Sequence, residues 1–85
     1  MKTIEPNNIK KGTVGYLKDT GWKFEMADNK KGNIRLAKVY GIFTEYGSIY
    51  THDIDYVIID DSVIRVDSSR YQKQTATVKA FDSMW

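Results

Sequence analysis

The 85-residue chain contains no cysteine, a single proline and no long apolar run. Without thiols it can form neither a disulfide bond nor a thiolate metal site. The longest apolar stretch, residues 56–59, has four residues, whereas a membrane-spanning helix needs about 20. With 28% charged and 41% hydrophobic residues, the composition is typical of a soluble folded domain. We therefore expect residues 1–85 to form one domain, located in the cytoplasm and not in a membrane.

Leucine and alanine, on which helical proteins depend, are also scarce, with two and four copies. β-branched and aromatic residues occupy 33 of the 85 positions, and such side chains pack well on a pleated sheet. The composition therefore predicts a mainly β fold with one helix at most.

Turn residues divide the chain into short candidate strands after a lead-in at residues 1–11. The clearest strand is 22–26, where Trp22, Phe24 and Met26 alternate with Lys23 and Glu25. Further strands are expected at 13–18, 33–40 (with a bulge near residues 37–38), 46–51, 56–59 and 63–66. Strands this short bury one face by curling. We predict an SH3-like β-barrel of five to six antiparallel strands over residues 12–66, with an OB-fold as the alternative.

A turn is predicted before the last strands and a helix after them. Residues 52–55, His-Asp-Ile-Asp, interrupt the strand pattern with three polar side chains and predict a tight or 3₁₀ turn. His52, Asp53 and Ile54 would form the kink that precedes the last strand of an SH3-like barrel. From residue 68 onward, apolar residues recur every three to four positions, which predicts a C-terminal helix over 68–85. Ser68 or Ser69 would cap this helix, and Asp67 would add a favourable negative charge at its start.

Four segments carry a resemblance to a known group of proteins. They are Gly-Trp at 21–22, Asp-Asn-Lys-Lys-Gly-Asn-Ile-Arg at 28–35, Val-Tyr-Gly at 39–41 and Gly-Ser-Ile-Tyr-Thr-His-Asp-Ile at 47–54. Across residues 12–54 the chain resembles small proteins encoded by tailed bacteriophages, and more distantly the SH3-like domains of the KOW and Tudor kind. The resemblance implies an SH3-like barrel in the cytoplasm of a bacterial host.

Charge is unevenly distributed along the chain. Residues 1–40 hold nine Lys and Arg against four Asp and Glu, a balance of +5, whereas residues 41–85 hold four against seven, a balance of −3. Basic side chains interleaved with tyrosines are typical of nucleic-acid surfaces, because cations neutralise phosphates and rings stack on bases. The predicted DNA- or RNA-binding residues are Lys18, Lys23, Lys30, Lys31, Arg35, Lys38 and Tyr16. Lys18, Lys23 and Arg35 are expected to share one outer face.

Eleven aromatic residues exceed what one small core needs, so some of them should be exposed. Exposed tyrosine and tryptophan are favoured at protein interfaces. The alternative prediction is therefore a module that binds a host protein or self-associates through Tyr46, Tyr50 and Trp85, as a monomer or a homodimer.

Support for catalysis rests on the single histidine. His52 adjoins Asp53, but neighbouring strand residues face opposite sides, so the two act together only where the backbone turns. The carboxylates of Asp55, Asp60 and Asp61 lack regular metal-ligand spacing. We expect a non-catalytic binding module without metal or cofactor, and an enzyme using His52 and Asp53 is a distant alternative.

Overall fold

The computed structural model describes residues 2–71, in which alternating side chains and tight turns produce a mainly β fold. The elements are β1 (Thr3–Ile4), η1 (Pro6–Asn8), β2 (Val14–Leu17), β3 (Lys23–Met26), β4 (Ile34–Tyr40), β5 (Thr44–Tyr50), η2 (Thr51–Asp53), β6 (Ile54–Ile59) and β7 (Ser62–Val66), where η marks a 3₁₀ helix. Residues 69–71 are helical. The prediction of a mainly β fold, and of a 3₁₀ turn at residues 52–53, is confirmed.

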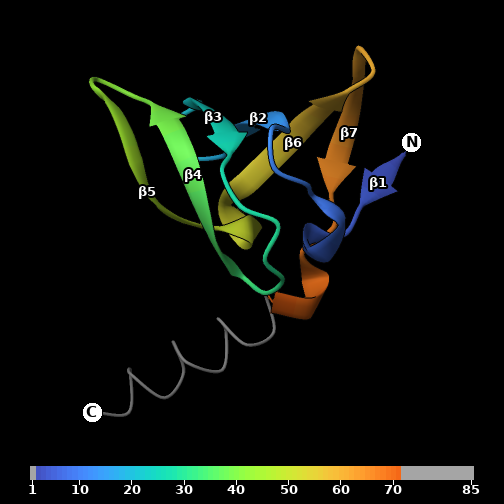
Figure 1. Cartoon of the computed structure of the whole chain (residues 1–85). Coiled ribbons are helices and arrows are strands. Elements are labelled where there is room, and N and C mark those ends of the chain that lie inside the picture. The colour runs from blue at the N-terminus through green and yellow to red at the C-terminus, as the bar shows by residue number, and fades with distance from the viewer. Residues whose placement is uncertain (1, 72–85) are drawn as a thin grey trace, which may run out of the picture.

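All seven strands belong to one sheet in the order β1-β7-β6-β2-β3-β4-β5. Each neighbouring pair is antiparallel except β1 and β7, which are parallel. The β4–β5 and β6–β7 hairpins extend as two divergent arms, with β2 and β3 between them (Figure 1).

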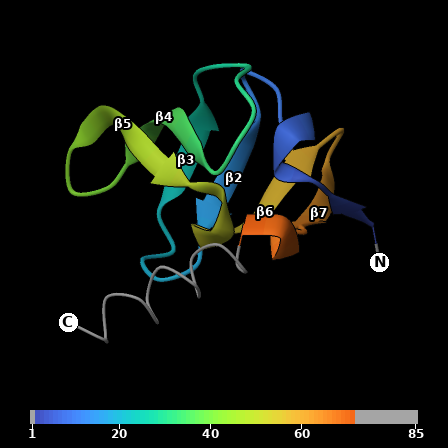
Figure 2. The same ribbon diagram turned by 90° about the horizontal axis from the view of Figure 1, so that it is seen from below.

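The sheet differs from the predicted barrel in strand number, in strand direction and in closure. It has seven strands, one pair of which is parallel, and among residues 2–71 its edge strands β1 and β5 do not pair with each other. The N-terminal segment supplies the seventh strand and the parallel pair, because β1 extends the sheet beyond β7. In the view from below, η1 lies beside the β6–β7 arm (Figure 2). Residues 1–11, predicted to be a lead-in, therefore contribute a strand and a 3₁₀ helix.

The core lies on the inner face of the curved sheet. Its fully buried members are Ile9, Phe24, Met26, Ala37, Ile54 and Val57. Gly15 pairs with Phe24 across β2 and β3, and a Cβ atom on Gly15 would lie 2.7 Å from the Phe24 ring and 2.6 Å from the Tyr56 carbonyl oxygen. The phenyl ring can cover β2 because this position is glycine.

The buried side of β4 is not the side that carries its apolar residues Ile34 and Leu36. Arg35 and Ala37 are fully buried, whereas Ile34 and Leu36 are 59% and 42% exposed. The strand pairs with β3 and β5 without a register shift, so the bulge predicted near residue 37 is wrong. The irregularity lies instead in the pairing of β2 with β6, between Tyr16 and Leu17.

The guanidinium of Arg35 joins three separate segments of the chain. Its Nε donates to Asp28 Oδ1 at 2.6 Å, and Nη2 donates to the Asp28 carbonyl oxygen at 2.8 Å. Nη1 donates to the carbonyl oxygen of Pro6 at 3.0 Å, and Nη2 also donates to that of Ile9 at 2.8 Å. A buried charge is tolerated only where it is paired and hydrogen-bonded, and Arg35 meets both conditions.

Asp28, the ion-pair partner of Arg35, lies in the loop between β3 and β4 and accepts hydrogen bonds from both the loop and β4. Burial raises the pKa of its carboxyl group, but hydrogen bonds from the Leu36 N–H, from Arg35 and from the Lys30 N–H, together with the charge of Arg35, outweigh burial. The pKa of Asp28 therefore lies below its ordinary value. The carboxylate is the form that the fold selects.

The described chain ends in a helical turn capped differently from the prediction. The Asp67 carboxylate accepts the Ser69 N–H at 3.2 Å, and hydrogen bonds from Ser69 lower the pKa of Asp67. The hydroxyl of Ser68 is buried and has no hydrogen-bond partner among residues 2–71. An aspartate, and neither serine, thus caps the turn, since its carboxylate reaches the free N–H. The predicted helix over 68–85 lies largely outside the described residues.

The β6–β7 turn contains two strained residues. Ile59 pairs with Ser62, which leaves a two-residue loop in which Asp60 and Asp61 have φ angles of 51° and 63°. Two positive φ angles define a type I′ turn, which favours Asn-Gly. The Asp60→Asn/Asp61→Gly double variant should raise the free energy of unfolding by about 1 kcal/mol, because it relieves the left-handed strain. Urea unfolding of both proteins measures the difference, and an unchanged or lower value would contradict the turn geometry.

Replacing Asp28 with Asn should lower the free energy of unfolding by about 3–5 kcal/mol at neutral pH. The substitution removes a negative charge from beside a fully buried guanidinium and turns one acceptor into a donor that faces other donors. Chemical denaturation at pH 7 provides the measurement. The Asp19→Asn variant, in the exposed β2–β3 turn, is the control and should unfold like the unmodified protein.

The same carboxylate predicts part of the acid sensitivity of the fold. Because its pKa is lowered on folding, Asp28 contributes stability above the unfolded pKa of about 3.9, and this contribution disappears as the pH falls through the lower folded value. Between pH 6 and pH 2, the free energy of unfolding should therefore fall less steeply in Asp28→Asn than in the unmodified protein. Equal pH slopes would show that the Asp28 carboxylate is not stabilised by folding.

Candidate nucleic-acid interface

The side of the sheet that faces away from the core gathers tyrosines and lysines from five adjacent strands. In register, Tyr56 of β6 lies opposite Tyr16 of β2, Tyr16 opposite Lys23 of β3, and Lys23 opposite Tyr40 of β4. Lys38 of β4 lies opposite Tyr46 of β5 in the next row. We call the surface formed by Tyr16, Lys23, Lys38, Tyr40, Tyr46 and Tyr56 the outer face.

These side chains contact one another. The rings of Tyr16 and Tyr56 have their centroids 5.1 Å apart at a tilt of 31°. The Nζ atoms of Lys23 and Lys38 lie 5.4 Å and 5.5 Å from the centroid of the Tyr40 ring, and Lys38 Nζ is also 5.9 Å from that of Tyr46. Such cation–π contacts hold the ammonium groups among the rings. Glu25, which lies opposite Lys38, places a carboxylate on this surface.

Four further lysines lie at the end of the sheet where β2 begins and β3 ends. Lys10 and Lys11 precede β2, Lys30 and Lys31 belong to the loop between β3 and β4, and all four are exposed. The two loops are adjacent, since the Lys11 N–H donates to Asn29 Oδ1 at 2.7 Å. We call these two loops the lysine loops. Their four lysines concentrate positive charge next to the outer face.

Most of the predicted nucleic-acid residues come together. Tyr16, Lys23 and Lys38 lie on the outer face, and Lys30 and Lys31 lie in the lysine loops. Lys18 is exposed in the β2–β3 turn, where its N–H donates to the Asp53 carbonyl oxygen at 2.7 Å.

Arg35 does not lie on the outer face, and its predicted position there is wrong. The alternation of β4 turns its side chain into the core, where Asp28 and two backbone carbonyls hold it. Tyr40 and Tyr56 are the members of the outer face that the predicted sites lack. Tyr56 was missed because it opens a run of apolar residues that predicts a buried strand. Only the pairing of β6 with β2 reveals its position, because that pairing places Tyr56 opposite Tyr16.

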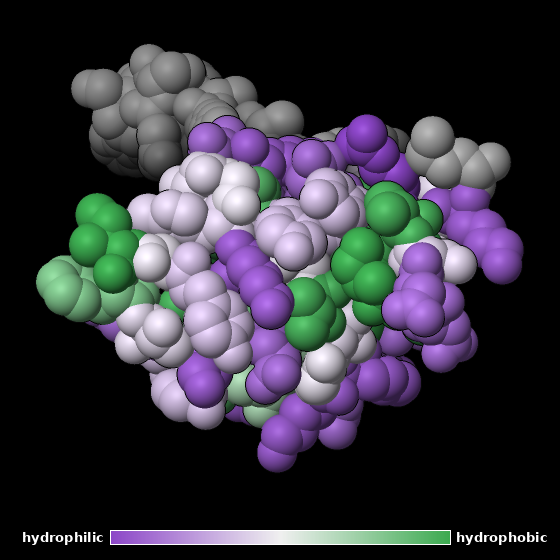
Figure 3. All heavy atoms as spheres, turned by 90° about the horizontal axis from the view of Figure 1, so that it is seen from above, coloured by the Kyte–Doolittle hydropathy of each residue, from purple (hydrophilic) through white to green (hydrophobic). Residues whose placement is uncertain are grey.

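The space-filling view from above shows how surface character is distributed (Figure 3). Hydrophilic and weakly hydrophilic side chains fill the centre, between two clusters of hydrophobic ones. The cluster on the left lies at the β4–β5 turn, where Ile42 and Phe43 are 83% and 74% exposed. Toward the β6–β7 arm, the strand register aligns Val14, Ile58 and Val63 in one row.

The predicted protein-binding residues are exposed where they are described. Tyr46 and Tyr50 are 68% and 49% exposed on β5, and Trp85 lies outside the described residues. Near them, the inner side of the β4–β5 turn has a hollow of about 240 Å³ lined by Trp22, Val39, Ile42, Phe43 and Glu45. Trp22 packs against Gly41, where a Cβ atom would lie 2.7 Å from the indole ring.

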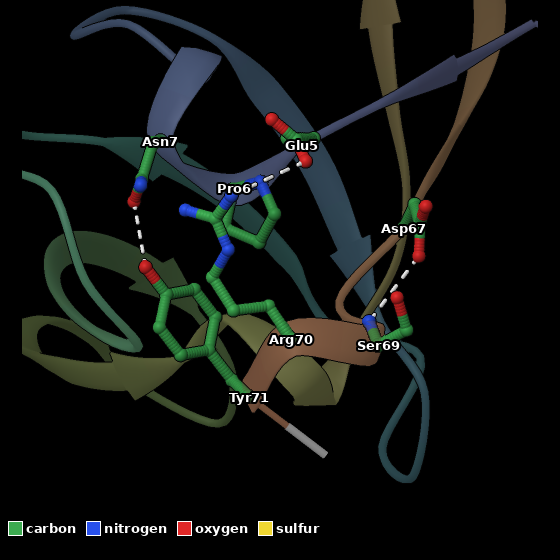
Figure 4. Close-up of a pocket in the computed structure, with 7 residues that line it drawn as sticks. All are labelled: Glu5, Pro6, Asn7, Asp67, Ser69, Arg70 and Tyr71. Atoms are coloured by element: carbon green, nitrogen blue, oxygen red, sulfur yellow. Dashed lines mark hydrogen bonds and ion pairs between the residues drawn. The ribbon is translucent and has the colours of Figure 1, made fainter. Parts of the chain in front are cut away.

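A second hollow lies where the described chain ends, at residues 67–71 (Figure 4). Asn7 Oδ1 accepts the Tyr71 hydroxyl at 2.8 Å, and Arg70 approaches Glu5 at 3.7 Å. The enclosed volume of about 10 Å³ has room for one water molecule at most. The contacts in Figure 4 thus fasten the end of the sheet to η1 and leave no space for a larger ligand.

His52 takes part in a hydrogen-bond network that anchors η2. Its Nδ1 lies 2.9 Å from Asn33 Nδ2, and Asn33 Oδ1 accepts the hydroxyl of Thr51 at 2.7 Å and the His52 N–H at 3.2 Å. His52 Nε2 is 3.6 Å from Asp53 Oδ1. The network connects the kink before β6 to the residue that precedes β4.

Two kinds of feature are absent from the described residues. Between residues 2 and 71, no group of three or more histidine, aspartate or glutamate side chains has the arrangement needed to hold a metal ion. No helix in that same part of the chain is long and apolar enough to cross a membrane.

Comparison of the chain with protein-family models, with curated proteins and with solved structures gives no match.

Proposed function

We propose that this protein is a non-catalytic module that binds DNA or RNA through the outer face and the lysine loops. The observation that carries the proposal is the cross-strand row of Tyr56, Tyr16, Lys23 and Tyr40, with Lys38 and Tyr46 beside it. Rings supply stacking area for bases, and ammonium groups held among them neutralise phosphates.

We also infer that the fold is of the SH3-like type, with β1 and β7 added at one side. Four strands, β2 to β5, follow one another as antiparallel neighbours, and η2 leads into β6, which returns to pair with β2. A kink before a returning last strand is the layout expected for an SH3-like barrel. This connectivity supports that reading over an OB-fold.

The proposal predicts a salt-dependent affinity that depends on particular lysines. Lys23→Gln and Lys38→Gln should each lower the slope of log affinity against log salt by about one, because each variant loses one phosphate contact. Fluorescence anisotropy with labelled DNA and RNA oligonucleotides provides the measurement. Lys2→Gln, with the same loss of charge at the exposed residue before β1, is the matched control and should keep the full slope.

Absence of binding to every DNA and RNA probe would overturn the proposal, as would binding that is independent of salt. Tyr40→Leu supplies a second test of the same surface. It should weaken binding by about 1–3 kcal/mol without a change in salt slope, because it removes stacking and no charge.

A second candidate function is protein binding through the β4–β5 hairpin, with a bacterial host protein or another copy of the chain as partner. It is favoured by the exposure of Tyr46, Tyr50, Ile42 and Phe43 on one hairpin. Affinity purification from nuclease-treated bacterial lysate should recover a partner that Tyr46→Ala loses and Val63→Ala keeps. Val63 is a suitable control because it is 60% exposed on the other arm. Equal recovery by both variants would remove this candidate.

A further inference from the structure

The β4–β5 hairpin carries most of the exposed apolar surface of the described chain. Six of its eight exposed large hydrophobic residues belong to this hairpin, namely Ile34, Leu36, Ile42, Phe43, Tyr46 and Tyr50. The other two are Trp22 and Val63. Apolar side chains concentrated in this way mark a surface that a partner covers.

β5 is also an edge strand, and its one protective charge is Glu45. Among residues 2–71 it pairs with β4 alone, so the other edge of this seven-residue strand presents backbone donors and acceptors at alternate residues. Proteins block such edges with lysine, proline or a bulge, or by keeping the strand short. β1, at the opposite edge, has two residues, whereas β5 has no lysine, no proline and an unbroken register.

We propose that β5 pairs antiparallel with β5 of a second copy, around a twofold axis at Gly47. A strand edge is complementary to itself under a twofold axis, which is the simplest route to a symmetric dimer. Gly47 is the midpoint of the seven residues of β5. Only the register centred on Gly47 pairs the strand along its whole length, Thr44 with Tyr50 of the second copy and Tyr46 with its Ser48.

Side-chain chemistry agrees with this register. Glu45 is the only charged residue of β5, and it would lie opposite Ile49 of the second copy, so no like charges meet across the axis. A Cβ atom built on Gly47 meets nothing within 4 Å, so a side chain introduced at the axis displaces no neighbour in its own chain. The two outer faces would become one continuous surface. This inference rests on the second proposed function and names its partner.

The absence of cysteine makes a register-specific test available, because one introduced cysteine is the only thiol in the chain. In the proposed register, residue 47 faces itself across the axis, within the Cα distance of about 7 Å that a disulfide allows. Residue 44 faces residue 50, so two copies of residue 44 lie about 20 Å apart along the strands. Under mild oxidation, Gly47→Cys should therefore form a disulfide-linked dimer, whereas Thr44→Cys should remain a monomer. Non-reducing gel electrophoresis of both variants provides the measurement.

Sedimentation velocity of the cysteine-free chain completes the test. The unmodified protein should approach twice its 9.8 kDa mass as its concentration rises, and Gly47→Ala should do the same. Gly47→Lys should remain monomeric and folded, because it places two ammonium groups opposite each other at the axis. Val63→Lys, with the same added charge on the other arm, should still dimerise.

A monomer at every concentration would overturn the self-pairing, as would cross-linking of Thr44→Cys as readily as Gly47→Cys. Failure here is distinguishable from failure of the second proposed function. A monomeric chain that still recovers a lysate protein in a Tyr46-dependent manner would refute the second copy as partner and leave protein binding by the hairpin standing.

Discussion

The buried ion pair of Arg35 and Asp28 is the interaction on which the rest of the structure depends. The four hydrogen bonds of the Arg35 guanidinium connect β4, the loop before it and the N-terminal segment at Pro6 and Ile9. The same loop carries Lys30 and Lys31 beside Lys10 and Lys11. An internal cation thus determines where the external cations lie, and the lysine loops owe their proximity to a guanidinium that solvent does not reach.

The two faces of the sheet have different physical tasks, and β4 shows this most directly. Its inward positions hold the arginine and a small residue that lets the core close, whereas its outward positions mix Ile34 and Leu36 with Lys38 and Tyr40. Lys38 and Tyr40, next to β3, suit a polyanion. Ile34 and Leu36, next to β5, suit a hydrophobic partner. One strand can therefore serve both proposed functions, since different neighbours complete each surface.

Local rules predicted the parts of the fold that local rules determine. Alternation around Phe24 and Met26, the turn at Asp60 and the kink at His52 were readable because strand period and turn chemistry act over a few residues. The burial of Arg35 was not, because a charge between Ile34 and Leu36 indicates an outward position. Only acceptors seven to 29 residues away reverse that indication. The sequence did not predict β1 for the same reason, since its partner β7 lies some 60 residues further along the chain.

The Arg35 cluster also determines which substitutions the chain can accept during evolution. Toward the N-terminal segment, the guanidinium binds carbonyl oxygens of the backbone, which every residue type supplies. Toward the loop it binds a carboxylate, which only an acidic side chain supplies. Divergent relatives would therefore be free to change the side chains around residues 6–9 as far as this cluster is concerned. They should retain an arginine seven positions after an aspartate, and that spacing is the signature by which distant members could be traced.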